Sequence, residues 1–199
     1  MSKSERFKKR YQAGDIPWDI ARPDYNLTET VRNLPIKSCK ALDIGCGMGD
    51  NSIWLTKNGF DATGTDIAEL AIEYAQRKAL RANVKCVFIA VDFLTSSIKG
   101  TPFGFAFDRG CFHSFDSDKE RKKYAKNVSA HLEKNGLWLT IVGSADDKPR
   151  ETGPPQRTAE DIVRAVEQYF EILSLVSGNF DSNNDTPPKA WICLMRKRE

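Results

Sequence analysis

Ten residues decide the fold of this chain: Ala41-Leu42-Asp43-Ile44-Gly45-Cys46-Gly47-Met48-Gly49-Asp50. The apolar residues at the start of this stretch indicate a buried parallel strand over residues 40–44. Three glycines follow on alternate positions, and a helical pattern begins directly after them. Because glycine has no Cβ, the backbone can turn sharply and lie against a ligand, next to the free N–H groups that start a helix. The stretch therefore predicts a strand, a turn that can hold a ligand, and a helix.

A carboxylate one strand further along indicates which ligand the turn holds. Asp66 ends an apolar run that begins at Phe60. In a βαβ unit, an acid at this place faces the ribose hydroxyls of a bound nucleoside. Strand, glycine turn, helix, strand and acid together predict a nucleoside-binding half of an α/β fold. The alternative is a glycine turn that only packs a helix against a strand.

The spacing of the glycines separates two kinds of nucleoside site. Dinucleotide-binding turns follow G-x-G-x-x-G and hold a pyrophosphate with backbone N–H groups. Here the spacing is Gly45-x-Gly47-x-Gly49, Asp50 follows directly, and no Lys or Arg lies nearby. An acid at that place is a poor neighbour for a pyrophosphate, but it is tolerated beside a ligand that carries an amino group.

The segment from Asp43 to Gly49 resembles motif I, D-x-G-x-G-x-G, of the class I S-adenosylmethionine-dependent methyltransferases. In that family the turn packs on the amino acid end of the cofactor, and the acid after the second strand takes both ribose hydroxyls. An acid after the third strand, here Asp92, accepts a hydrogen bond from adenine, and its neighbour Phe93 packs on the ring. The alternative for Asp92 is a turn or helix cap. The resemblance implies S-adenosyl-L-methionine as the cofactor, with contacts from Asp43, Gly45, Cys46, Gly47, Gly49, Asp66, Ile67, Asp92, Phe93, Asp108 and Arg109.

A segment near the N-terminus carries a second resemblance. Two prolines and a tryptophan in residues 15–24 do not suit a helix or a central strand. Pro17-Trp18-Asp19 with the downstream Arg22-Pro23 is similar to the N-terminal cap of the thiol, halide, thiopurine and tellurite methyltransferase group. The resemblance implies that this segment folds over the cofactor and that Trp18 contacts it, and a cation is attracted to an indole face. The alternative is a tryptophan that anchors an N-terminal arm on the core.

The residues after a strand predicted at 103–108 should border the pocket, because ligands of open α/β sheets lie beyond the carboxyl ends of the strands. The family has motif IV here, whose residues face the methyl donor and acceptor. His113 is the candidate catalytic base in this run, although a lone histidine can equally be structural. We expect His131 at the surface of a charged helix. Arg150 and Arg157 lie in a long polar loop, where we expect them to be solvated, the alternative being selection of an anionic acceptor.

The apolar runs predict a Rossmann-like, doubly wound α/β fold with a seven-stranded sheet, mostly parallel with an antiparallel last strand, and helices on both faces. The almost unbroken apolar run over 84–91 predicts a central parallel strand. Ser117-x-x-Glu120 predicts the start of a helix, which Asn135-Gly136 should end. We expect a single methyltransferase domain over residues 1–199, with residues 1–35 as a cap over the cofactor and residues 36–199 as the catalytic core.

Composition excludes several classes of protein. The chain has 199 residues, 40% of them hydrophobic and 29% charged, and a net charge of +3, which is too small to indicate nucleic acid binding. No stretch has the length of a membrane span, and the charged start lacks the apolar core of a signal peptide. Five scattered cysteines and two histidines indicate reduced thiols and no metal site. We expect a cytoplasmic monomer or homodimer with no nucleic acid or membrane partner.

Methyl transfer from a sulfonium mainly requires that donor and acceptor are held in line. A soft acceptor needs little help from a base, whereas a hydroxyl or amine usually needs one. The chain offers many aromatic residues and one candidate base, so we expect a small-molecule acceptor that is a thiol, a halide, or a selenium or tellurium species. The alternatives are an O- or N-methyltransferase of a small metabolite and a non-catalytic nucleoside-binding module. A nucleic acid methyltransferase and a dehydrogenase are disfavoured.

Overall fold

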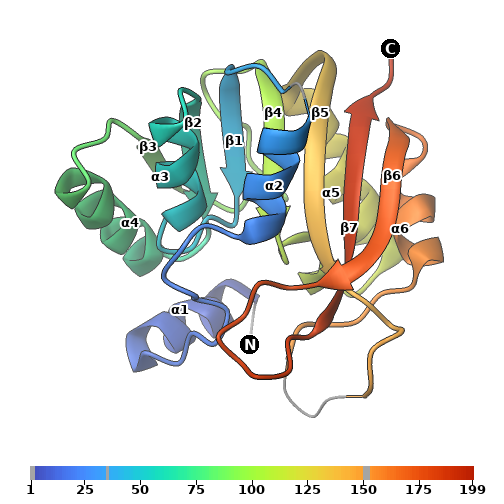
Figure 1. The fold of residues 1–199 in the computed structure, drawn as a ribbon, viewed down its shortest axis with the longest axis horizontal. Helices are drawn as coiled ribbons and strands as arrows, with labels where there is room; N and C mark the ends of the chain where they lie inside the picture. The colour runs from blue at the N-terminus through green and yellow to red at the C-terminus, as the bar shows by residue number, and fades with distance from the viewer. Residues whose placement is uncertain (1–2, 35, 150–152) are drawn as a thin grey trace.

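The computed structural model describes residues 3–34, 36–149 and 153–199. A seven-stranded sheet crosses the molecule in the order β3-β2-β1-β4-β5-β7-β6 (Figure 1). The strands are β1 (Lys40–Ile44), β2 (Asp61–Asp66), β3 (Val87–Ala90), β4 (Phe103–Arg109), β5 (Leu132–Gly143), β6 (Phe170–Asn179) and β7 (Lys189–Lys197). The helices are α1 (Lys3–Ala13), α2 (Tyr25–Asn33), α3 (Asp50–Lys57), α4 (Glu69–Arg81), α5 (Asp118–His131) and α6 (Ala159–Val166), with a 3-10 turn, η1, at Phe112–Ser114.

Strands β1 to β5 are parallel to one another. β7 runs antiparallel to both β5 and β6. Because side chains alternate across a strand, Ala41 packs on one face of the sheet and Leu42 on the other. α2 and α3 cover the first face through Leu27 and Leu55. α5 and α6 cover the second face (Figure 1). The predicted fold class is therefore confirmed.

The prediction of a central third strand is wrong. β3 pairs only with β2 and lies at the edge of the sheet. Its Phe88 is buried with Ile53 and Ala75 between α3 and α4, whereas Val87 is 54% exposed. The apolar residues at 84–88 pack under α4. A helix can bury the side chains of an edge strand as fully as neighbouring strands and helices bury those of a central strand.

The helix after Ser117 begins as predicted and ends differently. The capping box is present, with Glu120 N donating to Ser117 Oγ at 3.2 Å and Ser117 N donating to the Glu120 carboxylate at 3.4 Å. α5 ends at His131, and β5 begins at the next residue. Asn135, with φ of 61°, lies inside β5, near a register shift against β4. The Asn-Gly pair therefore marks an irregularity in a strand and does not end the helix.

His131, which we expected at the surface, is buried. Its side chain and backbone leave 3% of the residue exposed, and its Nε2 accepts a hydrogen bond from Ile98 N at 2.8 Å. The ring also packs against Phe93 at 5.2 Å between centroids. The charged residues Lys122, Lys123 and Lys126 of α5 are exposed, whereas His131 faces the segment between β3 and β4 that contains Phe93 and Ile98. Within the described residues, no helix combines the length and the apolar character needed to cross a membrane.

Candidate functional site

The glycine turn joins β1 to α3 at the carboxyl end of the sheet. Gly45, Gly47 and Gly49 have φ of 70°, 54° and 85°, a region that favours glycine. A Cβ on Gly47 would come within 3.0 Å of Tyr11 Oη, and one on Gly49 within 2.8 Å of Ala75 Cβ. The first part of the turn therefore keeps its backbone open toward the N-terminal segment, and Gly49 allows close packing of α3 against α4.

Two carboxylates that we predicted as cofactor contacts support the site from inside the core. Asp43 is 1% exposed and accepts a hydrogen bond from Ser52 Oγ at 2.6 Å, which ties β1 to α3. Asp108 is fully buried and accepts from Trp138 Nε1 at 2.9 Å and from the Phe112 N–H at 3.0 Å. Burial raises the pKa of Asp43 to about 7 and that of Asp108 to about 6. The hydrogen bonds of Asp43 therefore hold the loop after β1, and those of Asp108 hold the loop after β4.

Asp66 lies where the sequence placed it, at the end of β2 and against the glycine turn. Its Oδ2 accepts a hydrogen bond from Gly47 N at 3.0 Å, and its Oδ1 accepts from Ala68 N at 2.9 Å. Burial raises the pKa of this carboxyl group. A carboxylate has about four lone-pair sites, so Asp66 keeps the capacity to accept further hydrogen bonds from a ligand. Ile67 follows it directly and is half-buried.

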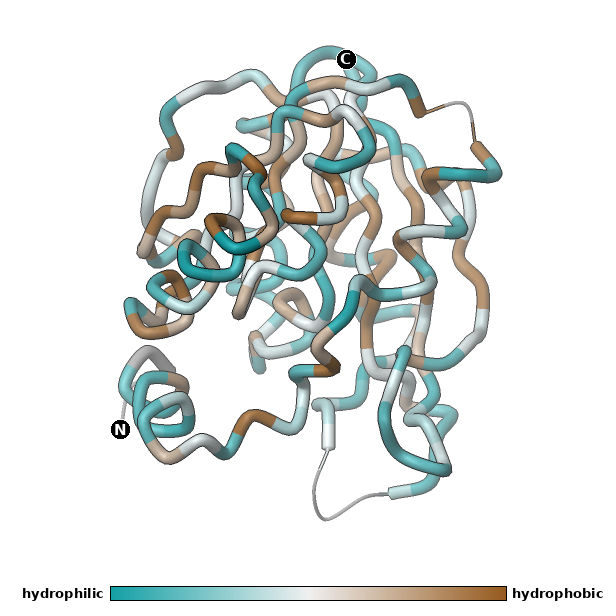
Figure 2. Tube along the Cα trace, turned by 60° about the vertical axis from the view of Figure 1, so that its left-hand side comes forward, coloured by the Kyte–Doolittle hydropathy of each residue, from teal (hydrophilic) through white to brown (hydrophobic). Residues whose placement is uncertain are grey.

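An N-terminal arm, residues 14–24, covers the turn. α1 lies at the carboxyl end of β1, where its Tyr11 packs against Ala71 of α4, and the arm leads from α1 to α2 (Figures 1 and 2). Tyr11 is 5% exposed, and its Oη accepts a hydrogen bond from Trp18 Nε1 at 3.2 Å. Burial first, and then the charge of Asp66, raise the pKa of Tyr11 well above its usual range. Tyr11 is thus a neutral phenol that faces Gly47.

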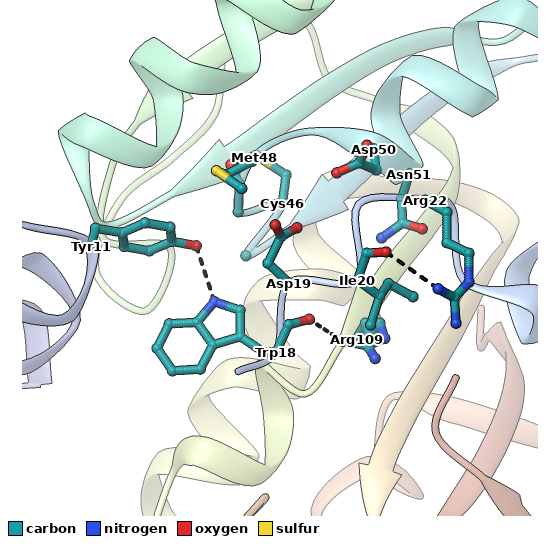
Figure 3. Close-up of a pocket in the computed structure, with 12 residues that line it drawn as sticks. Tyr11, Trp18, Asp19, Ile20, Arg22, Cys46, Met48, Asp50, Asn51 and Arg109 are labelled. Atoms are coloured by element: carbon teal, nitrogen blue, oxygen red, sulfur yellow. Dashed lines mark hydrogen bonds between the residues drawn. The ribbon is translucent and has the colours of Figure 1, made fainter. Parts of the chain in front are cut away.

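Arm and turn enclose a cleft with about 440 Å³ of space between them, part of it open to solvent (Figure 3). The residues that line it are Tyr11, Trp18, Asp19, Ile20, Arg22, Gly45, Cys46, Gly47, Met48, Asp50, Asn51 and Arg109. Five of the predicted cofactor residues are therefore brought together here: Trp18, Gly45, Cys46, Gly47 and Arg109.

Arg109, at the end of β4, holds the arm in place. Its Nε donates to the buried Asp24 at 2.6 Å, and another nitrogen donates to Trp18 O at 2.9 Å. A third donates to the backbone oxygen of Asp181, in the loop between β6 and β7. Arg22 of the arm pairs with the side chain of the same Asp181. These bonds join three segments that are far apart in the sequence, and they occupy the guanidinium groups.

His113, the candidate base, is 7% exposed and lies in η1 next to Phe180. Its Nδ1 accepts a hydrogen bond from Gly143 N at 2.9 Å. Burial first, and then the nearby charges of Arg157 and Arg109, lower the pKa of His113 to about 3. A backbone N–H can only donate, so the ring is neutral with its proton on Nε2. In this arrangement neither ring nitrogen has a free lone pair with which to remove a proton from an acceptor.

The acid after β3 and its neighbour lie outside the cleft lining. The Asp92 carboxylate accepts a hydrogen bond from Leu94 N at 2.9 Å, which is the turn-capping arrangement. The Phe93 ring is 5% exposed and packs on Tyr124 at 5.6 Å between centroids, in the core under α5. The structure thus directs the Phe93 side chain away from the cleft, while Asp92 remains exposed at the carboxyl edge of the sheet.

Sequence reasoning missed most of the arm's contribution. Tyr11 of α1 and both Asp19 and Arg22 of the arm line the cleft. Among the residues of α1 and the arm, only Trp18 was predicted to contact a cofactor. The signal was present in Pro17-Trp18-Asp19, where a carboxylate follows the tryptophan. Arg157, expected in solvent, has a side chain only 14% exposed that donates to His113 O at 2.8 Å, so it supports η1. Arg150 lies outside the described residues.

The chain is similar to several methyltransferases. A model of the family described as methyltransferase domain matches residues 41–136. The chain is 26% identical over 169 residues to probable thiol methyltransferase 2 of Arabidopsis thaliana, which covers 84% of this chain and 70% of that protein. It is 28% identical over 148 residues to the probable S-adenosyl-L-methionine-dependent methyltransferase TehB of Haemophilus influenzae, which covers 74% of this chain and 48% of TehB. The chain thus spans about half the length of that relative.

The fold also matches solved structures. One of them comes from a study of the conversion of a disulfide bond into a thioacetal group during echinomycin biosynthesis. It superposes on this chain with a TM-score of 0.84 at 20% sequence identity, covering 98% of this chain and 92% of that one. At 20% sequence identity, this similarity shows that the two chains share a fold and nothing more.

Proposed function

Because this chain belongs to the class I S-adenosylmethionine-dependent methyltransferases, we propose that it transfers the methyl group to the soft nucleophilic atom of a small molecule. The acceptor atom would be the sulfur of a thiol, a halide, or a selenium or tellurium atom. The proposal for the acceptor rests chiefly on His113, whose hydrogen bond with Gly143 N leaves it no free lone pair. A soft acceptor needs no strong base, and an alcohol or amine usually does.

The residues present suit the donor. The turn at Gly45 and Gly47 offers backbone without side chains, and Asp66 beside it has capacity for two hydroxyl groups. We therefore assign the nucleoside end of S-adenosylmethionine to Asp66 and the amino acid end to the glycine turn. Trp18 of the arm and Tyr11 of α1 would cover it, so residues 1–35 would act as a cap over the core formed by residues 36–199.

When it is bound, S-adenosylmethionine supplies an electrophilic methyl group on a sulfonium. The chain's own contribution is to hold the reactants in line and to keep water out, because a reaction that disperses charge is slowed by strong solvation of its reactants. The aromatic rings of Tyr11 and Trp18, 5.9 Å apart between centroids, provide an apolar wall on the arm side of the cleft. The hydrogen bond from Arg109 to Trp18 O holds the Trp18 ring over the turn.

The name of one relative supports the same acceptor class, and the name of the other supports the methyl donor. One relative is named a probable thiol methyltransferase. The second is named a probable S-adenosyl-L-methionine-dependent methyltransferase. Sulfur in a thiol is a soft nucleophile, which agrees with a site that offers no free base on His113.

The test measures methyl release from labelled S-adenosylmethionine in the presence of iodide, sulfide, simple thiols or tellurite, with a phenol and an amine as hard acceptors. We expect turnover with at least one soft acceptor, and we expect His113→Asn to retain it. Asn keeps an amide oxygen that can accept from Gly143 N, so the η1 turn should be preserved. Asp66→Ala is expected to weaken cofactor binding by about 1–3 kcal/mol, the usual range for a hydrogen bond to a charged group.

A flat result with every soft acceptor, together with activity on the phenol or the amine, would contradict the proposed acceptor class. Loss of that activity in His113→Asn would then assign a base to His113. Unchanged binding of S-adenosylmethionine to Asp66→Ala in calorimetry would contradict the ribose contact. Tight binding without any methylated product would instead favour a non-catalytic nucleoside-binding module.

A further inference from the structure

Asp19 is a carboxylate of the arm that lies inside the cleft. It sits between Trp18 and Ile20, and all three residues line the space over the glycine turn. Figure 3 shows the Asp19 carboxylate turned from the arm toward the glycine turn, next to Cys46. Burial is the main cause that raises the pKa of Tyr11, and the negative charge of Asp19 adds the smallest contribution, so Asp19 also lies near the Tyr11 hydroxyl.

The cations around Asp19 are already paired with other carboxylates. Arg22 pairs with Asp181, and Arg109 pairs with Asp24. Arg10 pairs with Asp15 and Lys78 with Asp50. Within the part of the chain that the structure describes, no ion pair includes Asp19, and its carboxylate accepts one long hydrogen bond, from Ala21 N at 3.3 Å. The cleft therefore holds a negative charge that the neighbouring side chains do not neutralise.

The backbone that leads into Asp19 is fixed by hydrogen bonds. Asp19 N donates to Ile16 O at 2.9 Å. The preceding residue, Trp18, is held through its carbonyl by Arg109 at 2.9 Å and through its indole by Tyr11 at 3.2 Å. A charge fixed in advance costs little reorganisation when a ligand binds, so its electrostatic contribution to affinity is large.

We propose that Asp19 is the counter-ion of the sulfonium, and that it makes the cleft prefer the methyl donor over the demethylated product. This inference rests on the proposed function. S-adenosylmethionine has a positive sulfur and S-adenosylhomocysteine a neutral one, while their amino acid and nucleoside parts are alike. A fixed carboxylate near the sulfur lowers the free energy of the charged ligand only. Transfer of the methyl group removes that attraction, so the product is released more easily than the donor.

The test compares the affinity of the two ligands by calorimetry at low ionic strength, using wild type, Asp19→Asn and Asp61→Asn. Asp61 is exposed at the opposite end of β2, so its variant matches the change in net charge without touching the cleft. In Asp19→Asn we expect about tenfold weaker binding of S-adenosylmethionine and less than about a twofold change for S-adenosylhomocysteine, on the scale of a close charge pair in a partly exposed site. Asp61→Asn should leave both affinities unchanged.

Two further readouts distinguish a counter-ion from a structural residue. Asp19→Glu keeps the charge and should retain the preference for the donor. Kinetics of Asp19→Asn should show a higher KM for S-adenosylmethionine and no loss of kcat, because the attraction stabilises the bound donor at least as much as the transition state, in which the charge is dispersed. An equal loss of affinity for both ligands, or none for either, would overturn the assignment to the sulfonium. Failure of the wild type to bind either ligand would overturn the proposed function itself, and this inference with it.

Discussion

Burial sets the ionisation state of His113, Asp43 and Asp108, which lie next to the cleft. The native pKa of His113 is about 3, below its usual value of 6.5, so the native histidine stays neutral where the unfolded one takes up a proton. As pH falls through 6.5, stability is therefore lost. The buried carboxyl groups act in the opposite direction, because their native pKa values of about 7 and about 6 lie above 3.8. Their contribution to stability falls as pH rises from about 4 toward 7.

A comparison of wild type with His113→Asn isolates the histidine, since both proteins keep Asp43 and Asp108. Between pH 6.5 and pH 5, the wild type should lose about 2 kcal/mol of unfolding free energy relative to the variant. Urea denaturation at several pH values in that window measures the difference. Parallel stability curves for the two proteins would mean that the histidine is protonated in the native state, and the assignment of its Nε2 proton would be wrong.

At the scale of the elements, two glycines at the junction of β1 and α3 have different roles. The backbone at Gly47 faces the arm, and Gly49 lies against α4 and Phe88, where a Cβ would meet the ring at 2.9 Å. The bond between Asp43 and Ser52 holds the strand and the helix in register. One motif therefore contains both a position that lines the cleft and a packing position.

Alanine at each of these two glycines should separate the two roles. Gly49→Ala should lower the unfolding free energy by about 3 kcal/mol, because it adds overpacking to the strain of a positive φ. Gly47→Ala should cost only about 1–2 kcal/mol of stability, from the strain of a positive φ and one tight contact with the Tyr11 hydroxyl. It should weaken S-adenosylmethionine binding at least tenfold, because the added methyl group lies at the side of the turn that faces Tyr11 and the cleft. Equal stability losses, or unimpaired binding in Gly47→Ala, would contradict this division. Urea denaturation and calorimetry supply the two measurements.

At the scale of the whole molecule, the site is completed by segments that meet only after folding. The arm, the end of β4 and the loop between β6 and β7 are joined by Arg109 and Arg22. The two arginines differ in burial. The Arg109 side chain is 13% exposed and its partner Asp24 is fully buried, whereas Arg22 is 43% exposed. The Arg109–Asp24 ion pair is therefore part of the core, and the Arg22–Asp181 ion pair holds the arm at the surface.

Replacing each arginine by methionine should give distinct outcomes. Arg109→Met leaves the Asp24 charge buried without its partner and should lower the unfolding free energy by about 3–5 kcal/mol. Arg22→Met should leave global stability nearly unchanged and increase hydrogen exchange in residues 15–24 alone. Hydrogen exchange followed by mass spectrometry, with Arg32→Met on exposed α2 surface as the control, reads out both changes. Arm exchange that is the same in Arg22→Met and the control would show that Asp181 does not fasten the arm.

The amino-acid sequence by itself determined the local elements and the half-fold that binds the nucleoside. The bounds of β1 match the prediction, and α3 begins at Asp50 as expected. The capping box at Ser117 lies where the sequence predicted it. These features depend on periodicity, on capping side chains and on the conformational freedom of glycine, all of which act between residues close in the chain. The meeting of Asp66 with the glycine turn followed from the handedness of a βαβ unit.

Only the tertiary structure decided which side chains face the cleft. It placed β3 at the edge of the sheet, buried His131, turned Phe93 into the core and brought Asp19 over the glycine turn. Each of these outcomes depends on contacts between residues far apart in sequence, such as that of Arg109 with Trp18 O, 91 positions away. Such contacts form when helices, arm and loops pack together, and a local pattern has no information on which distant surface will cover a given residue.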